Sequence, residues 1–309
     1  MDSLVAIDWG TTALRGARLG ADATVLEERR FERGVASMAG AAFEAVFDEH
    51  FGDWMGGADS LCLIGGMAGS KQGWVEAPYV ACPARFEDLC TRLTWVASPR
   101  RIAIAPGMTC HHAGIPDVMR GEELQVFGAL QLLNRADGLL VLPGTHSKWV
   151  TVRAGHVQRF YTVMTGEFYG LLRRHSFLAR SMPEADADPD FPAFDQGVAV
   201  ALSSRSLMQT AFGVRTLSLF DRVRPESLPS YLSGLVIGEE LRSQMTQDMQ
   251  SGGDVIVIGT DALTQRYERA LSQQGIVVKT LGAAAGWAGL WAMGQVVRGA
   301  GPTQSPSGA

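Results

Sequence analysis

The beginning of the chain alternates between apolar runs and short polar turns, a pattern typical of β-hairpins. An apolar run over residues 4–7 predicts a buried strand, which leads into Asp8 and a polar turn before the next apolar run. Gly10 in this turn lets the backbone approach an anion closely, and the amides and hydroxyls of Thr11 and Thr12 can donate to phosphate oxygens. Asp8 can hold a hydrated Mg²⁺ beside them. The alternative is an ordinary hairpin with a polar turn.

The same pattern returns at the start of the second half of the chain. Residues 138–142 predict a strand, and strands over 147–153 and 157–161 follow it. The turn between the first two strands consists of Gly144, Thr145, His146 and Ser147. Two such units suggest duplicated domains that face one ligand, and two facing hairpins suit a triphosphate. The pattern therefore predicts a two-lobed nucleotide-binding protein.

The remaining periodicity predicts an α/β chain. Apolar residues at helical spacing favour helices and short apolar runs favour buried strands. The expected strands cover residues 60–64, 101–105, 254–258 and 277–278. The expected helices cover residues 38–51, 86–93, 124–133, 168–175, 196–212, 231–241, 262–274 and 283–297.

A glycine-rich segment over residues 65–74 follows one of these strands. Its glycines expose backbone amides, while polar side chains and one large aromatic ring accompany them. These groups match a hydroxylated, anionic small molecule, and the alternative is a long surface loop. The substrate-binding candidates in this segment are Ser70, Lys71, Gln72, Gly73 and Trp74.

Two adjacent acids precede the apolar run of the helix over 124–133. Glu122 and Glu123 stand at its expected first turn, directly after Arg120 and a glycine. A carboxylate fixed there could take the proton from a substrate hydroxyl during phosphoryl transfer. Acids at a helix start are also common as simple stabilisers of the helix dipole. The pattern leaves open which of the two acids is the base.

Further candidates lie in the second half. Gly259 and Thr260 join a predicted strand to a predicted helix, an arrangement in which a nucleotide can lie across the helix start. Glu167, in a small polar turn after the second hairpin, could line the cleft from the second lobe. Lys148 follows the second glycine-threonine turn, where it suits either the transferred phosphate or a substrate carboxylate.

Composition narrows the class of partner. The chain has 309 residues, enough for two domains, and a formal net charge of −5, which argues against nucleic acid or an anionic membrane as the main partner. The four cysteines show no C-x-x-C pairing, and there is no apolar stretch of transmembrane length, so we expect a cytoplasmic protein.

No P-loop and no protein-kinase glycine loop occurs, so phosphoryl chemistry would use another scaffold. A homodimer is left open.

Taken together, the motifs resemble the 2-dehydro-3-deoxygalactonokinase family. The resemblance runs in order from about residue 4 to residue 297, and the combination is far more specific than any single piece. The motifs that carry it are Asp8-Trp-Gly-Thr-Thr12, Gly66-Met-Ala-Gly-Ser-Lys-Gln-Gly-Trp74, Met119-Arg-Gly-Glu-Glu123, Pro143-Gly-Thr-His-Ser-Lys-Trp149, Met164-Thr-Gly-Glu167 and Leu232-Ser-Gly-Leu-Val-Ile-Gly238.

This resemblance implies an actin-like ATPase fold, with two ribonuclease-H-like lobes and the active site in the cleft between them. It implies transfer of the ATP γ-phosphate, with Mg²⁺, to the 6-hydroxyl of 2-dehydro-3-deoxy-D-galactonate in galactonate breakdown. Asp8 to Thr12 then resembles a first phosphate loop, Gly144 to Ser147 a second, and Gly259-Thr260 an adenosine turn. Arg120, together with the donors of the glycine-rich segment, would bind the sugar acid.

We accordingly expect an N-terminal lobe over residues 1–134 and a C-terminal lobe over 135–309. The first would carry the first phosphate loop and the sugar-acid site, and the second the other phosphate loop and the adenosine site. The helix over 283–297 would pack near the lobe junction, and residues 299–309 would form a disordered tail. Two other functions stay open: a kinase for another sugar acid such as 2-dehydro-3-deoxygluconate, and a non-catalytic actin-like ATP-binding regulator.

Overall fold

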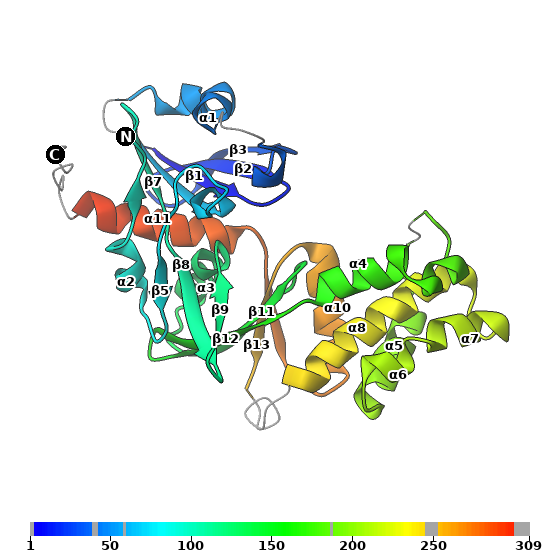
Figure 1. The fold of residues 1–309 in the computed structure, drawn as a ribbon. Helices are drawn as coiled ribbons and strands as arrows, with labels where there is room; N and C mark the ends of the chain where they lie inside the picture. Colours follow the sequence, from blue (N-terminus) through cyan, green and yellow to red (C-terminus); the bar gives the residue numbers. More distant parts are fainter. Residues whose placement is uncertain (1–2, 39–42, 58–59, 186–187, 245–252, 300–309) are drawn as a thin grey trace. The chain divides into compact units, whose positions relative to one another are not determined.

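The computed structural model describes residues 3–38, 43–57, 60–185, 188–244 and 253–299, and its chain divides into two compact units (Figure 1). Unit 1 comprises Met1–Gly138, Val150–Phe160 and Ala283–Ala309, and unit 2 comprises Leu139–Trp149 and Tyr161–Gly282. Both contain β-sheet and helix, so the fold is mixed α/β, as expected. The expected tail falls almost wholly outside the described residues.

The main sheet of unit 1 begins with the predicted hairpin. Its strand order is β3-β2-β1-β4-β7-β6; β1 pairs antiparallel with β2 and parallel with β4. The antiparallel hairpin forms because the turn is short, whereas the parallel neighbours need longer crossover connections. The strands are β1 (Leu4–Trp9), β2 (Leu14–Leu19), β3 (Val25–Phe31), β4 (Leu61–Gly66), β6 (Thr94–Trp95) and β7 (Arg101–Ile104).

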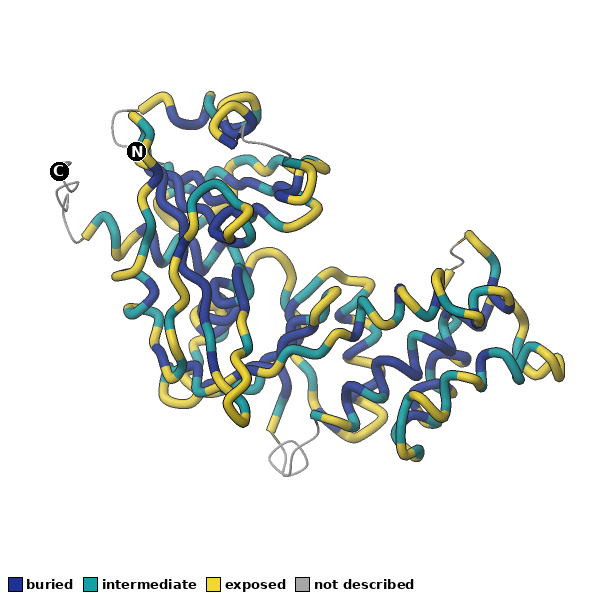
Figure 2. Tube along the Cα trace, in the orientation of Figure 1, coloured by how far each residue is buried: buried dark blue, intermediate teal, exposed yellow. Residues whose placement is uncertain are grey.

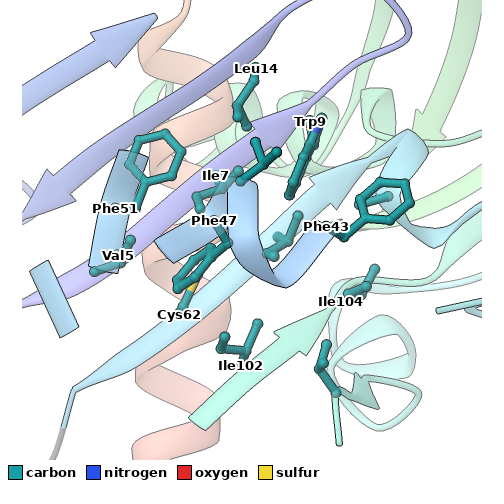
Figure 3. Close-up of a cluster of buried hydrophobic side chains, with 14 of the residues drawn as sticks. Val5, Ile7, Trp9, Leu14, Phe43, Phe47, Phe51, Cys62, Ile102 and Ile104 are labelled. Carbon is teal, nitrogen blue, oxygen red and sulfur yellow. The ribbon is translucent and has the colours of Figure 1, made fainter. Parts of the chain in front are cut away.

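Strand β1 is buried on both faces, as Figure 2 shows by its dark tube. Val5, Ile7 and Trp9 point to one face, where they pack against α1 (Phe43–Phe51) in the cluster drawn in Figure 3. Leu4 points to the opposite face and contacts α11 (Ala284–Gly299) near Gly294. This two-residue alternation explains why the sequence reads as a continuous apolar run: a central strand needs apolar residues on both sides.

Helix α11 belongs to unit 1, whereas the sequence placed residues 283–297 in the C-terminal lobe. The reason is close packing on α3 (Glu122–Leu132). A Cβ on Gly128 would lie 1.9 Å from the carbonyl oxygen of Ala285, and one on Gly289 would lie 2.1 Å from that of Leu124. Only glycine permits this contact between helix backbones, so Gly128 and Gly289 determine where the helix docks.

Residues 150–160 also group with unit 1, although they form most of the two strands that follow the second glycine-threonine turn. Ala84 and Val157 exchange two backbone hydrogen bonds, with N···O distances of 3.2 and 2.9 Å, and the Cys110 thiol donates to the carbonyl of Phe160. These contacts tie the segment to a small sheet of order β5-β8-β9. The other elements of unit 1 are β5 (Tyr79–Ala81), β8 (Gly107–His112), β9 (Ile115–Met119), α2 (Phe86–Cys90) and the 3₁₀ turns η1 (Val35–Ser37), η2 (Gly52–Met55) and η3 (Met67–Gly69).

A second sheet has the order β12-β11-β10-β13-β14, with β13 parallel to both β10 and β14. The first sheet, read as β3-β2-β1-β4-β7, repeats this arrangement, which agrees with the duplication inferred from the two hairpins. The strands are β10 (Gly138–Leu142), β11 (Ser147–Arg153), β12 (His156–Val163), β13 (Val255–Ile258) and β14 (Val278–Leu281).

Helices of unit 2 pack on this sheet and on one another, in one core beside the strands and a second among the helices. Helices α5 and α8 interlock through glycines, since a Cβ on Gly234 would lie 2.0 Å from the carbonyl oxygen of Phe194. The elements are α4 (Thr165–His175), α5 (Phe191–Ser203), α6 (Leu207–Thr210), α7 (Gly213–Leu219), α8 (Leu228–Gln244), α10 (Asp261–Ser272), η4 (Phe177–Ser181) and η5 (Pro225–Ser227).

Several boundaries differ from the sequence expectation. The helix expected over 196–212 is two helices, α5 and α6, and α5 begins at Phe191 because Asp190 caps it by accepting the N–H of Ala193 at 3.0 Å. Helices α3 and α4 begin earlier than expected, so Glu122, Glu123 and Glu167 all lie in first helical turns. The glycine-rich segment is compact rather than a long loop: β4 continues through Gly66 into η3.

Among the described residues, no helix combines the length and the apolar character that a membrane crossing requires.

Candidate active site

The turn after β1 is braced from behind by a second segment of unit 1. The amides of Gly34, Val35 and Ala36 donate to the carbonyls of Thr12, Gly10 and Thr11 in turn, at 3.0–3.1 Å. A Cβ on Gly34 would lie 2.3 Å from the Thr11 carbonyl oxygen, so only glycine fits there. With their carbonyls held, Thr11 and Thr12 stay exposed, and within the described residues neither amide has a protein acceptor. The turn is thus fixed with its donors outward, as an anion site requires.

Asp8 lies at the end of β1 and forms an ion pair with Arg15 on β2. The two residues are cross-strand partners in the antiparallel register, which explains the pairing. Both side chains are about a quarter exposed, so the carboxylate remains accessible. Sequence reasoning assigned Asp8 to Mg²⁺ and did not identify Arg15.

Asp8 and the acids of α3 meet across one glycine. Gly66, at the end of β4, has φ +86°, and a Cβ there would lie 3.2 Å from Asp8 Oδ1. Gly121, with φ +106°, precedes α3, and its Cβ would lie 3.1 Å from the Cα of Gly66. Both backbone angles favour glycine strongly. The structure therefore brings Asp8 and the start of α3 together in unit 1.

The two acids of α3 have different environments. Glu122 is partly exposed and accepts the backbone N–H of Arg120 at 2.9 Å. Glu123 is completely buried, and both of its carboxylate oxygens accept the N–H of Gly121, at 2.8 and 2.7 Å. Burial, and secondly the charge of Glu122, raises the pKa of Glu123 to about 8. Of the two carboxylates, that of Glu122 is therefore the more accessible to solvent.

Arg120 is largely buried instead of projecting from the surface. Its guanidinium lies 4.2 Å from the centre of the Tyr79 ring, and Nη2 donates to the carbonyl of Ala77 at 2.8 Å. Nη1 is buried beside Gly69 and has no hydrogen-bond partner among the described residues. The guanidinium is therefore held in one position next to the glycine-rich segment.

The predicted substrate donors of residues 70–74 divide into two groups. Lys71 and Gln72 are exposed, as a ligand contact requires. Ser70 is buried, and its hydroxyl has no hydrogen-bond partner in the described part of the chain; Trp74 is partly buried and packs against Phe43 and Trp9 beside the core of unit 1. A Cβ on Gly73 would collide with the Ala68 carbonyl oxygen at 2.2 Å, so Gly73 closes the turn. The structure does not place Trp74 as a flat face for a ligand, because its ring fills a core position.

The second turn is supported by the start of α4. The N–H of Glu167 donates to the carbonyl of Thr145 at 3.0 Å, and a Cβ on Gly166 would lie 2.4 Å from the carbonyl oxygen of Gly144. Thr145 and His146 are exposed, and His146 Nε2 lies 2.5 Å from Glu167 Oε2. This pairing was not expected, since the sequence assigned His146 to the nucleotide and Glu167 to the substrate.

Two other residues of this turn point inward. Ser147 is fully buried and its hydroxyl lies 3.1 Å from the hydroxyl of Tyr267. Lys148 is 6% exposed, and its ammonium donates to the Thr162 hydroxyl at 2.8 Å. The Ser147 hydroxyl therefore does not lie at the surface beside Thr145 and His146, because it is buried against the Tyr267 hydroxyl.

Gly259 and Thr260 lie beside the second turn. They follow β13, the parallel neighbour of β10, and a Cβ on Gly259 would lie 3.7 Å from Cδ of Pro143, which directly follows β10. Thr260 precedes the first turn of α10 and is exposed. The carboxyl ends of parallel strands share one edge of a sheet, so these motifs, distant in sequence, meet in unit 2.

Sequence reasoning missed three residues that shape these turns: Gly34, Arg15 and Tyr267. Gly34 carried no motif, and the pairing of Arg15 with Asp8 depends on the register of β1 and β2. Tyr267 contacts Ser147, which is 120 residues away in sequence. Within the described residues, no group of three or more histidine, cysteine, aspartate or glutamate side chains could hold a metal ion by itself. A nucleotide-bound Mg²⁺ needs only one or two protein carboxylates, so the single accessible Asp8 fits such an ion.

Comparison with known proteins agrees with the resemblance found in the motifs. The family model of 2-keto-3-deoxy-galactonokinase, another name for the same activity, matches residues 8–293. The 2-dehydro-3-deoxygalactonokinase of Escherichia coli (strain K12) is 36% identical over 271 residues, which are 88% of this chain and 90% of that protein.

Two solved structures are similar. A Sinorhizobium meliloti protein assigned as a 2-dehydro-3-deoxygalactonokinase is 35% identical with a TM-score of 0.87, and the match covers 95% of this chain and 99% of that one. The activator of 2-hydroxyisocaproyl-CoA dehydratase from Clostridium difficile is 12% identical with a TM-score of 0.52, covering 99% and 100%, and it shows a shared fold alone. Since the family model spans nearly the whole chain, this protein belongs to the 2-keto-3-deoxy-galactonokinase family.

Proposed function

We propose that this protein transfers the γ-phosphate of ATP to the 6-hydroxyl of 2-dehydro-3-deoxy-D-galactonate, a step in galactonate breakdown. Membership of the family supports the reaction and the substrate. The structural observation that carries the proposal is the convergence of Asp8, Gly66 and the start of α3 in unit 1. Gly66 lies next to Asp8, the carboxylate proposed for a phosphate-bound metal, and next to Gly121, which immediately precedes Glu122 on α3.

Glu122 is the general base in this proposal. It takes the proton of the 6-hydroxyl while the oxygen forms a bond to the γ-phosphorus, and the bond from that phosphorus to the bridging oxygen of ADP breaks. Partial exposure lets Glu122 reach the substrate, and the Arg120 N–H orients its carboxylate. Glu123 is a poor candidate because it is completely buried and its raised pKa leaves it mostly protonated at neutral pH.

The two braced turns would hold the nucleotide phosphates. The outward amides of Thr11 and Thr12 in unit 1, and the exposed Thr145 and His146 in unit 2, supply donors of the kind that cradle phosphate. Asp8 would hold Mg²⁺, which neutralises phosphate charge when bound, and Gly259-Thr260 would carry the adenosine. We further propose that each unit is a ribonuclease-H-like lobe of an actin-like ATPase and that one ATP engages both turns.

The sugar acid would be recognised by its carboxylate. Lys71 and Gln72 are the exposed donors of the glycine-rich segment, and the fixed guanidinium of Arg120 adds positive charge beside Gly69 of the same segment. A charge-assisted contact is stronger than a neutral hydrogen bond, so a sugar without a carboxylate should react poorly. The cytoplasmic location expected from the sequence stays a prediction.

An ATP-to-ADP coupled assay over a panel of 2-keto-3-deoxy sugar acids and neutral sugars tests the proposal. We expect the galacto acid to have the highest kcat/KM and galactose to be a very poor substrate. A higher kcat/KM for 2-dehydro-3-deoxygluconate would reassign the substrate to that epimer. ATP binding without turnover of any sugar acid would favour the non-catalytic regulator instead.

A further inference from the structure

Beneath the second turn lies a buried carboxylate that the reaction described above does not use. Glu240, on α8, is 1% exposed, and its carboxylate accepts hydrogen bonds from three other elements of unit 2. Oε1 accepts the indole N–H of Trp149 on β11 at 2.6 Å. Oε2 accepts the hydroxyl of Tyr267 on α10 at 2.5 Å and the hydroxyl of Thr165 at the start of α4. We call these four residues the Glu240 network.

The Glu240 network connects to both flanks of the turn over residues 144–147. On the strand side, Trp149 lies two residues after Ser147, and the Ser147 hydroxyl also contacts the Tyr267 hydroxyl at 3.1 Å. On the helix side, Thr165 immediately precedes Gly166, whose Cα packs against the Gly144 carbonyl. One carboxylate therefore fixes the strand that leaves the turn and the helix that supports it.

Glutamate has a specific advantage in this position. An ionised carboxylate is an acceptor through both oxygens, so it can satisfy three donors at once, whereas an amide offers one acceptor oxygen. All three donors are neutral, and burial raises the pKa of Glu240 above its ordinary value, although the hydrogen bonds partly offset this effect. If this position served packing alone, an apolar side chain would fill it without the cost of burying a carboxylate.

We propose that Glu240 is a positioning residue for nucleotide binding: through Trp149, Tyr267 and Thr165 it holds the turn over residues 144–147 in the geometry that receives the ATP phosphates. The inference rests on the proposed function, because it assigns that turn to the nucleotide. Glu240 touches neither substrate nor nucleotide and acts only through its three donors. Replacing Glu240 should therefore weaken the binding of ATP and leave the binding of the sugar acid unchanged.

The test compares Thr165→Val with Thr165→Ser, and Glu240→Gln with the unaltered protein. Valine keeps the shape of threonine but removes the donor, while serine keeps the donor. We expect Thr165→Val and Glu240→Gln to raise the Kd for MgADP, measured by calorimetry, and the KM for ATP by roughly tenfold or more, since small displacements of binding groups are costly. The KM for the sugar acid should stay constant, and Thr165→Ser should bind MgADP like the unaltered protein.

Ile237→Val serves as the matched control, because Ile237 is buried on α8 one turn before Glu240 and contacts the same core without joining the network. It should lower the Tm and leave MgADP affinity unchanged. Unchanged affinity in both Thr165→Val and Glu240→Gln would overturn the inference, as would a loss in Ile237→Val of the same size. If the unaltered protein bound no MgADP, the proposed function would fail as well, whereas binding without sugar-acid turnover would refute only the sugar-acid reaction.

Discussion

At the residue scale, one position along a helix separates an accessible acid from a buried one. Glu122 and Glu123 are neighbours on α3, where successive side chains point about 100° apart, since 3.6 residues complete one turn. Glu123 consequently lies inside unit 1 with its carboxylate on the Gly121 amide, and Glu122 faces outward. Replacing each acid in turn therefore compares the loss of an accessible carboxylate with the loss of a buried one at neighbouring positions.

Replacing Glu122 by glutamine should lower kcat by about 10²–10⁴-fold, the usual contribution of a general base. Glu123→Gln should keep most of the activity, because the amide oxygen can still accept the Gly121 N–H. Steady-state kinetics at saturating ATP measure both. A large loss in Glu123→Gln together with an active, folded Glu122→Gln would reverse the assignment.

Glu123 should also make stability depend on pH. Its pKa rises from about 4.5 in the unfolded chain to about 8 in the folded protein, so the folded state holds the proton more tightly. The free energy of unfolding should therefore fall as pH rises from about 4.5 to 8, at up to about 1.4 kcal/mol per pH unit from this group. In urea unfolding across this pH range, the free energy of unfolding should fall less for Glu123→Gln than for the unaltered protein. An equal fall in the free energy of unfolding of the two proteins would contradict a buried, protonated Glu123.

At the element scale, glycines decide how helices and turns fit together. Gly66 and Gly121 have the positive φ angles that join a strand end to α3, and Gly128 and Gly289 let α3 and α11 touch backbone to backbone. In unit 2, Gly166 does the same between α4 and the second turn. These positions link the proposed phosphate contacts to the cores of their units.

Gly166→Ala tests this role directly. The added methyl would lie 2.4 Å from the Gly144 carbonyl oxygen, so either the turn or α4 must move. We expect a loss of about 1–3 kcal/mol in the free energy of unfolding, as for other overpacked sites, together with weaker MgADP binding. Gly282→Ala is the control, since a methyl there meets no atom within 4 Å. If Gly166→Ala and Gly282→Ala had the same free energy of unfolding and the same affinity for MgADP, the close contact at Gly166 would matter neither for stability nor for nucleotide binding.

At the scale of the whole molecule, the same strand order occurs in both sheets, and each carries a braced turn after its first strand. If one ATP engages both turns, full binding must bring donors of the two units to the same phosphates. Binding would then favour a closed arrangement over an open one.

Small-angle X-ray scattering should accordingly report a smaller radius of gyration when a non-hydrolysable ATP analogue and the sugar acid are both bound. Each ligand alone should have a lesser effect, because fewer contacts would span the units. The variant Thr165→Val provides a comparison with weaker nucleotide binding. An unchanged radius at saturation of both ligands would argue against closure.

The sequence by itself determined the strands that flank the two glycine-threonine turns, the turns themselves and the family, whereas β5, β6, β8 and β9 were not predicted. Short apolar runs and turn residues are local signals, and they identified the hairpins around Gly10 and Gly144 that the structure contains. The acid pair at the start of α3 was also visible, because helix starts have characteristic residues. Helix boundaries were less accurate, since caps such as Asp190 and interruptions such as the one after Ser203 depend on neighbouring elements.

Only the tertiary structure decided how these pieces are used. It buried Glu123 and Ser147, packed Trp74 against the core, and left Glu122 partly exposed and Lys71 exposed. These differences follow from which face of each helix or strand meets the core. It also assigned α11 to unit 1, because the glycines of that helix match those of α3. The Glu240 network joins four elements that are far apart in sequence. Burial and hydrogen bonding between distant segments have no local signature, and they arise only when the chain is folded.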